Sequence, residues 1–146
     1  MANLSALTTL IDLASKDSDN AAKKLGQALR MAEDTEQKLN LLLNYRDEYA
    51  ARFQTSMTAG LTAVDYRNFR HFIEKLDAAI EGQQSIVMAA KHQTEIERKS
   101  WQDCERKRMS YDTLASRAEK QLQQQENKRD QKQTDEHAAR AAMHKR

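Results

Sequence analysis

The sequence contains no proline, only three glycines and a single cysteine among its 146 residues. Because proline and glycine are the residues that most often interrupt helices, this composition favours long, continuous helices. The lone Cys104 cannot form a disulfide within the chain, which fits a reducing compartment. No segment approaches the ~18 consecutive apolar residues of a membrane-spanning helix, and no basic run precedes an apolar stretch near residue 1. We therefore expect a cytoplasmic protein without signal peptide or membrane span.

Large apolar residues are also scarce. Leu, Ile, Val and Phe together number 24 of 146, too few for an ordinary globular core. Disorder would be expected if the net charge were high, but it is only +2. A chain of this kind can still fold if its apolar residues lie along one line, where a narrow seam between helices replaces the core.

Such a line runs through residues 4–53 at alternating steps of three and four. Twelve of its fifteen positions are apolar, and a sustained period of 3.5 residues is typical of a left-handed coiled coil. The many alanines on it allow two helices to approach closely. The positions are Leu4, Leu7, Ile11, Ala14, Ser18, Ala21, Leu25, Ala28, Ala32, Thr35, Leu39, Leu42, Arg46, Tyr49 and Phe53.

The periodicity stops in "TSMTAGLTAVD", where Gly60 suits a helix end and Thr62 with Asp65 resembles a capping box. A second line follows, with thirteen of seventeen positions apolar and a weak patch at Thr94 and Glu97. Its positions are Tyr66, Phe69, Ile73, Leu76, Ile80, Gln83, Val87, Ala90, Thr94, Glu97, Trp101, Cys104, Arg108, Tyr111, Ala115, Ala118 and Leu122.

Two such lines with a short connection predict an all-α fold, a long antiparallel two-helix coiled-coil hairpin forming a single domain over residues 1–146. We expect helix one at about 3–55, a tip at about 56–64 and helix two at about 65–140. A turn near residue 61 places Phe53 level with Phe69, and helix one is then paired with helix two along its whole length. Residues from about 119 onward then form a C-terminal extension without a partner in the chain.

The stretch "NFRHFIEKLDAAI" at 68–80 carries more apolar side chains than the seam needs. Phe72 and Ala79 lie beside the seam, and with Leu76 and Gln83 they form a second line along one flank. An apolar flank on a thin coiled coil is a candidate docking surface. The alternative is that Phe72 folds over the seam and thickens its packing.

No pattern in the sequence points to catalysis. Gly26, Gly60 and Gly82 are isolated, so there is no phosphate-binding loop, and no two histidines are three or four residues apart, as a metal site on a helix requires. We expect no enzyme activity, cofactor or metal. Residues 91–146 hold 14 Lys and Arg against 10 Asp and Glu, too mixed a charge for a nucleic-acid surface. A structural coiled coil that dimerises or acts as an adaptor remains the alternative function.

Five segments in this order resemble the FliJ family of flagellar type III export proteins: "LIDLASK", "YRDEY", "NFRHFIEKLDAAI", "KSWQDCERKR" and "DQKQTDEHAARAAM". The likeness covers nearly the whole chain. It implies a non-enzymatic cytoplasmic stalk, similar in shape to the central stalk of rotary ATPases. Members of the family bind the hexameric export ATPase ring and promote its activity, link it to the membrane export gate, and escort export chaperones. The membrane is reached only through the gate, and we expect a monomer when the protein is free.

The resemblance also implies site residues. The gate-binding line of the family is Phe, Leu, Ala and His, which this sequence matches at Phe72, Leu76 and Ala79, while Gln83 stands in place of the histidine. The C-terminal segment is similar to the part that meets the ATPase ring, although a charged helix end is otherwise commonly just solvated. The candidate ring-binding residues are Asp135, Glu136, Arg140, Ala142 and Met143.

Overall fold

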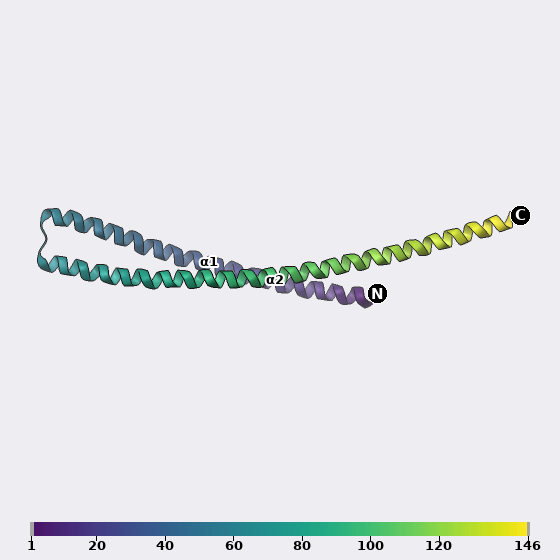
Figure 1. Ribbon diagram of the computed structural model, residues 1–146, viewed down its shortest axis with the longest axis horizontal. Coiled ribbons are helices and arrows are strands. Elements are labelled where there is room, and N and C mark those ends of the chain that lie inside the picture. The colour runs from purple at the N-terminus through teal and green to yellow at the C-terminus, as the bar shows by residue number, and fades with distance from the viewer. Residues whose placement is uncertain (1, 146) are drawn as a thin grey trace. The chain divides into compact units, whose positions relative to one another are not determined.

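Two helices account for nearly all of the computed structural model, which describes residues 2–145 (Figure 1). Helix α1 spans Ala2–Ala59 and helix α2 spans Ala63–His144. The two helices pack against each other, and the described residues contain no strand. The predicted all-α helical hairpin is confirmed. No helix within these residues combines the length and the apolarity needed to cross a bilayer.

The connection between the helices is shorter than the nine residues predicted, because α1 continues to Ala59. The hydroxyls of Thr55 and Thr58 bond to carbonyls four residues earlier, so these polar groups are satisfied within the helix. Gly60 then ends the helix with a φ of 92°, a left-handed conformation that glycine adopts without steric cost. At the start of α2, the Asp65 amide donates to the Thr62 hydroxyl at 3.2 Å, which is the N-cap half of the predicted capping box.

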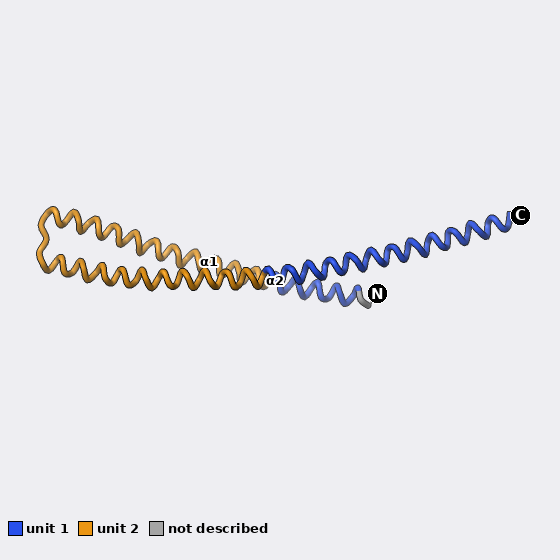
Figure 2. Tube along the Cα trace, in the orientation of Figure 1, with its two compact units in different colours: residues 1–19, 102–146 blue, residues 20–101 orange. Residues whose placement is uncertain are grey.

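The sequence predicts one domain, and the packing distinguishes two compact units (Figure 2). The turn unit comprises Asn20–Trp101 and contains the connection between the helices. The terminal unit combines the residues up to Asp19 with those from Gln102 onward. In both units a segment of α1 lies beside a segment of α2.

The seam is the line along which the helices bury their side chains. All fifteen seam positions predicted in the first helix are buried or half-buried, as are sixteen of the seventeen in the second. The exception is Tyr66, beside the turn, which is 47% exposed. The 3.5-residue period therefore identified the inward face of both helices correctly.

Six of the eight aromatic residues lie against one another in the turn unit, in stacked, tilted and edge-to-face pairs that form an aromatic ladder between the helices. The rings of Phe53 and Phe69 lie 3.5 Å apart between centroids and nearly parallel, which confirms the predicted level of these two residues. Such pairs add stability beyond the area they bury. The members of the ladder are Tyr45, Tyr49, Phe53, Tyr66, Phe69 and Phe72.

Polar residues on the seam of the turn unit find partners on the opposite helix. Thr94, which is 5% exposed, donates from its hydroxyl to the Ala28 carbonyl at 3.3 Å and also contacts the Ala90 carbonyl. The Gln83 amide donates to the Thr35 carbonyl at 3.0 Å. Because these groups are bonded, burying them carries little penalty, and the weak patch in the second apolar line does not open the seam.

Candidate partner-binding surfaces

Phe72 lies half-buried at the edge of the aromatic ladder. Its ring centroid is 4.4 Å from that of Tyr49 and 5.9 Å from that of Tyr45, where the two rings meet edge to face. Phe72 thus thickens the packing near the turn, as one of the two readings of the sequence expected. The half that stays accessible is still free for a contact, so the two readings are compatible.

The other residues of the predicted gate-binding line differ in exposure. Leu76 belongs to the seam and is only 7% exposed, and Gln83 is half-buried with its amide already bonded to α1. Ala79 is exposed. In this conformation Phe72 and Ala79 are therefore the accessible residues of the line, while Leu76 and Gln83 are engaged in the seam.

Neighbouring apolar residues that the sequence analysis did not assign extend this flank. Ile86, one heptad beyond Ala79, is exposed. On α1, a groove of about 500 Å³ is lined by Lys38, Leu41, Leu42, Tyr45 and Gln83, and Tyr45 also touches Phe72. The run of three leucines at 41–43 was the available signal, because a seam position uses only Leu42 and leaves the other two exposed. We call Phe72, Ala79, Ile86 and this groove the flank surface.

The C-terminal part of α2 is exposed on every side. Leu122 is the last half-buried residue, and all residues from 123 to 145 are exposed. The candidate ring-binding residues Asp135, Glu136, Arg140, Ala142 and Met143 all lie in this segment. A helix that is polar all round gains nothing from packing on its own chain, so the segment is available to a partner.

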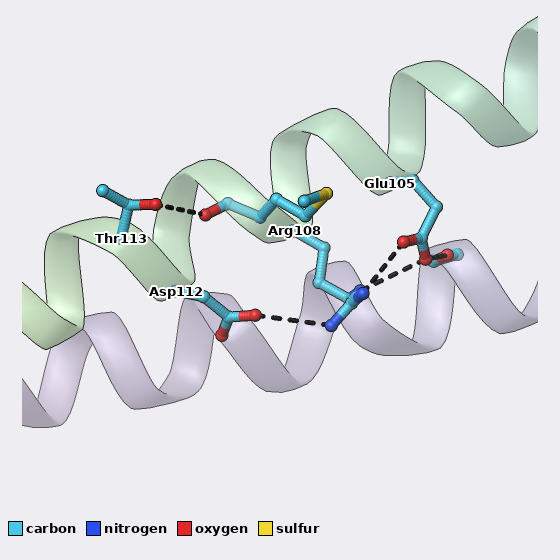
Figure 3. Close-up of polar contacts among 6 residues, drawn as sticks. Glu105, Arg108, Asp112 and Thr113 are labelled. Carbon is cyan, nitrogen blue, oxygen red and sulfur yellow. Dashed lines mark hydrogen bonds and ion pairs between the residues drawn. The ribbon is translucent and has the colours of Figure 1, made fainter.

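A polar cluster interrupts the seam of the terminal unit (Figure 3). Arg108 reaches Glu105 at 2.8 Å and Asp112 at 3.3 Å along α2, and the Ser18 hydroxyl on α1 donates to the same Glu105 carboxylate. The hydrogen bonds from Arg108, and then that from Ser18, lower the pKa of Glu105 from 4.5 to about 2. The cluster therefore ties the helices together with a charged carboxylate at neutral pH.

The Glu105 contact predicts a dependence of stability on pH. Because the pKa is lower in the folded chain, the stabilisation is complete above 4.5 and disappears as the pH falls towards 2. Between pH 4.5 and pH 2, the melting temperature of the Glu105→Gln variant, measured by circular dichroism, should therefore fall less than that of the parent chain. Glu119→Gln, at an exposed position of the same helix, should follow the parent chain. Identical curves for all three proteins would contradict the assignment.

The described residues hold no arrangement typical of a metal site. Residues 2–145 contain no group of three or more His, Cys, Asp or Glu side chains able to hold an ion. The four histidines are exposed along α2, and Cys104 is a free, half-buried thiol on the seam.

Two long helices that bury one narrow seam and leave a stretch of α2 unpaired define a coiled-coil hairpin protein. Residues 3–146 match the family described as "Flagellar FliJ protein". The chain belongs to this family of flagellar proteins, as the resemblance in the sequence predicted.

Two curated relatives share the length of the chain. The Flagellar FliJ protein of Salmonella typhi is 35% identical over 145 residues, which cover 99% of each chain. The Flagellar FliJ protein of Escherichia coli (strain K12) is 34% identical over 145 residues with the same coverage. The similarity therefore extends over both units and both helices.

Proposed function

We propose that this chain is a non-enzymatic component of the flagellar protein export apparatus, acting as a coiled-coil stalk between the export ATPase and the export gate. In this role residues 123–145 of α2 enter the hexameric ATPase ring and promote its activity. The flank surface contacts the cytoplasmic domain of the gate, and the chain also escorts export chaperones. It works in the cytoplasm, at the inner face of the membrane at the flagellar base, and reaches the membrane only through the gate.

The observation that carries this proposal is the uneven use of the two helices. Seam positions are covered from Leu4 to Phe53 on α1 and from Phe69 to Leu122 on α2, whereas the following 23 residues of the chain (123 to 145) are exposed throughout. The free chain gains nothing from so long a charged helix, whereas a partner that surrounds the helix can contact all of its sides. Charged side chains at Asp135, Glu136 and Arg140 supply groups for ion pairs with the wall of a ring.

A stiff connection is what such a role needs. A coiled coil holds a fixed length and transmits a displacement from one end to the other, which a flexible linker cannot do. Cross-helix bonds such as Gln83 to Thr35, and the ion pair of Arg46 with Asp77 at 2.6 Å, fix the register of the turn unit. Because the side chains of Arg46 and Asp77 are 39% and 50% accessible, solvent screens the pair, which contributes to register more than to stability.

The alternative function is a structural coiled coil that dimerises through its seam. The seam positions of both helices are already covered within one chain, which favours a monomer. Gel filtration with light scattering separates the two. A monomer at all concentrations supports the stalk, and a concentration-dependent dimer supports the alternative.

Replacing Phe72 with aspartate tests the gate contact. We expect binding to the cytoplasmic domain of the gate to be lost, because a charge removes the apolar contact that the one aromatic ring of α2 on the flank surface would supply. The free energy of unfolding should fall by only about 1–2 kcal/mol, since Phe72 is half-buried against Tyr45 and Tyr49. Biolayer interferometry with the gate domain and urea unfolding measure the two effects.

The matched control is Met88→Asp, which places the same charge at an exposed apolar residue of α2, 73% accessible and outside the flank surface. It should retain binding. A Phe72→Leu variant, which keeps an apolar side chain, should bind within a few-fold of the parent chain. Equal binding by the Phe72→Asp and Met88→Asp variants would remove the flank surface from the proposal.

A further inference from the structure

A second groove, of about 870 Å³, lies beside the turn. We call it the turn groove. Its apolar part is formed by Met57, Leu61 and Tyr66, of which Met57 is 56% exposed although it lies next to the seam. Exposed apolar side chains beside the turn are stabilised when another molecule covers them. The lining residues are Met57, Leu61, Thr62, Ala63, Tyr66, Arg67, Arg70, His71 and Glu74.

The rim of the turn groove is positively charged. Arg67 and Arg70 are exposed, and neither forms an ion pair with any residue in the range 2–145. His71 lies beside them, and Glu74 is the one acidic side chain of the lining. The two arginines are the fifth and eighth residues of α2, beyond the first turn, where the helix dipole no longer acts strongly on a side-chain charge. Their position is therefore not explained by the stability of the hairpin.

The turn groove and the flank surface lie on different sides of α2. Arg70 and Phe72 are two residues apart, and residues at this spacing point to opposite sides of a helix. Phe72 packs against Tyr49, whereas Arg70 lines the groove with Tyr66. A ligand of the turn groove therefore does not compete for the side chains assigned to the gate, and the following inference does not depend on the proposed function.

We propose that the turn groove binds an acidic, amphipathic segment of a partner protein. Apolar side chains of the segment cover Met57 and Tyr66, and its carboxylates pair with Arg67 and Arg70. The pairing is charge-assisted and can be bidentate, since each guanidinium is free to present its planar fork to a carboxylate. Apolar contact supplies the affinity, and the two arginines select an acidic sequence.

The charge of the site favours a protein segment over a membrane surface. Residues 52–75 carry four Lys and Arg against two Asp and Glu, and Glu74 on the rim would face the lipid phosphates. Basic clusters that bind anionic lipid usually hold 4–8 positive charges without such opposition. An amphipathic helix, in contrast, can turn an uncharged position towards Glu74.

The proposal is tested by fluorescence anisotropy with the full chain and a labelled synthetic peptide, an amphipathic helix of about 18 residues with Leu on one face and Glu beside it. Two matched peptides replace Glu by Gln, or Leu by Ser. We expect saturable binding of the acidic peptide, weakening as salt is added, and binding about tenfold weaker for either matched peptide. No saturable binding, or equal affinity for the Glu and Gln peptides, would overturn the proposal.

Two double variants locate the binding. Arg67→Glu with Arg70→Glu should lower the affinity for the acidic peptide by about tenfold or more. The double variant should leave helicity unchanged, because both side chains are exposed. The control, Arg117→Glu with Lys120→Glu, makes the same charge change at the same spacing on exposed positions of the terminal unit. It should bind like the parent chain. Equal losses in both variants would mean that general charge, not the turn groove, attracts the peptide.

A third variant does not alter charge. Met57→Gln keeps a helix-forming residue of similar length at an exposed site. It should lower the affinity for the acidic peptide several-fold, because it removes apolar contact. Vesicles of phosphatidylglycerol and phosphatidylcholine provide the competing ligand. Unchanged peptide affinity in Met57→Gln, or binding to these vesicles that depends on Arg67 and Arg70 and displaces the peptide, would contradict a protein segment as the occupant.

Discussion

Truncating the chain after Leu122 should abolish stimulation of the export ATPase while leaving the coiled coil folded. The removed residues bury nothing on their own chain, so the free energy of unfolding should change by less than about 0.5 kcal/mol. Under the proposed function the same residues are the ones that enter the ring, and ATPase activity should fall to the level without added protein. Steady-state phosphate release and urea unfolding measure the two quantities.

A full-length control separates the sequence of this segment from its presence. Replacing Asp135, Glu136 and Arg140 with alanine preserves helix propensity and length but removes the charges. We expect stimulation between that of the parent chain and the truncated one, because under the proposed function the alanines and Met143 would still contact the ring wall. Unchanged stimulation after truncation would show that the segment is idle. A truncated chain that unfolds would show that the segment is structural.

Phe69→Ala should cause the largest loss of stability among single substitutions in the aromatic ladder. Phe69 stacks on Phe53 at 3.5 Å and on Tyr49 at 5.3 Å, so alanine removes contacts with two rings of α1 at once. Truncating a buried phenylalanine costs about 3–5 kcal/mol, and for a half-buried ring we expect about 2–3 kcal/mol. This is a large share of a stability of about 5–15 kcal/mol.

The control for this substitution is Met88→Ala, which shortens an exposed apolar side chain on the same helix. Its effect should stay below about 0.5 kcal/mol. Both values come from urea unfolding followed at 222 nm, the usual helix signal. If Phe69→Ala cost no more than Met88→Ala, the ladder would not hold the turn unit together.

The sequence predicted the fold well because a coiled coil depends on one periodic feature. Steps of three and four identify the inward face of each helix, and the turn at Gly60 is the only strong break, so the register follows. The level of Phe53 and Phe69 was correct for this reason. The helix end at Ala59 was missed, because the threonines before Gly60 suggest a loop by composition, yet their hydroxyls bond back to the helix.

The surfaces were harder to predict, because exposure depends on what stands opposite each residue. Leu76 and Gln83 belong both to the seam and to the predicted gate-binding line. A pattern on one helix does not show that packing against the other helix buries Leu76 and that the Gln83 amide bonds to α1. Tyr45 joins Phe72 from the other helix, so no pattern within α2 indicates it. The turn groove likewise combines Met57 of α1 with Arg67 of α2, which only the turn brings together.

The polar cluster around Glu105 illustrates the same limit. Ser18 and Arg108 are polar and so do not count among the apolar positions of their seams. In the structure they meet at one carboxylate, which lies between the seam and the surface. A periodicity count registers only the apolar seam positions and passes over the polar ones. Two polar side chains at the same level on opposite helices can nevertheless hydrogen-bond to each other or to a shared partner.

The central claim is that α1 folds back on α2 of the same chain, and zero-length crosslinking tests it most directly. In the turn unit the Lys91 ammonium lies 2.9 Å from the Glu36 carboxylate, so carbodiimide should join these two side chains by an amide bond. The reaction is run on an equal mixture of ¹⁴N- and ¹⁵N-labelled chains and followed by mass spectrometry. We predict crosslinked 36–91 peptides of uniform isotope only. Mixed-isotope peptides would show that the helices pair between chains, and would contradict the hairpin.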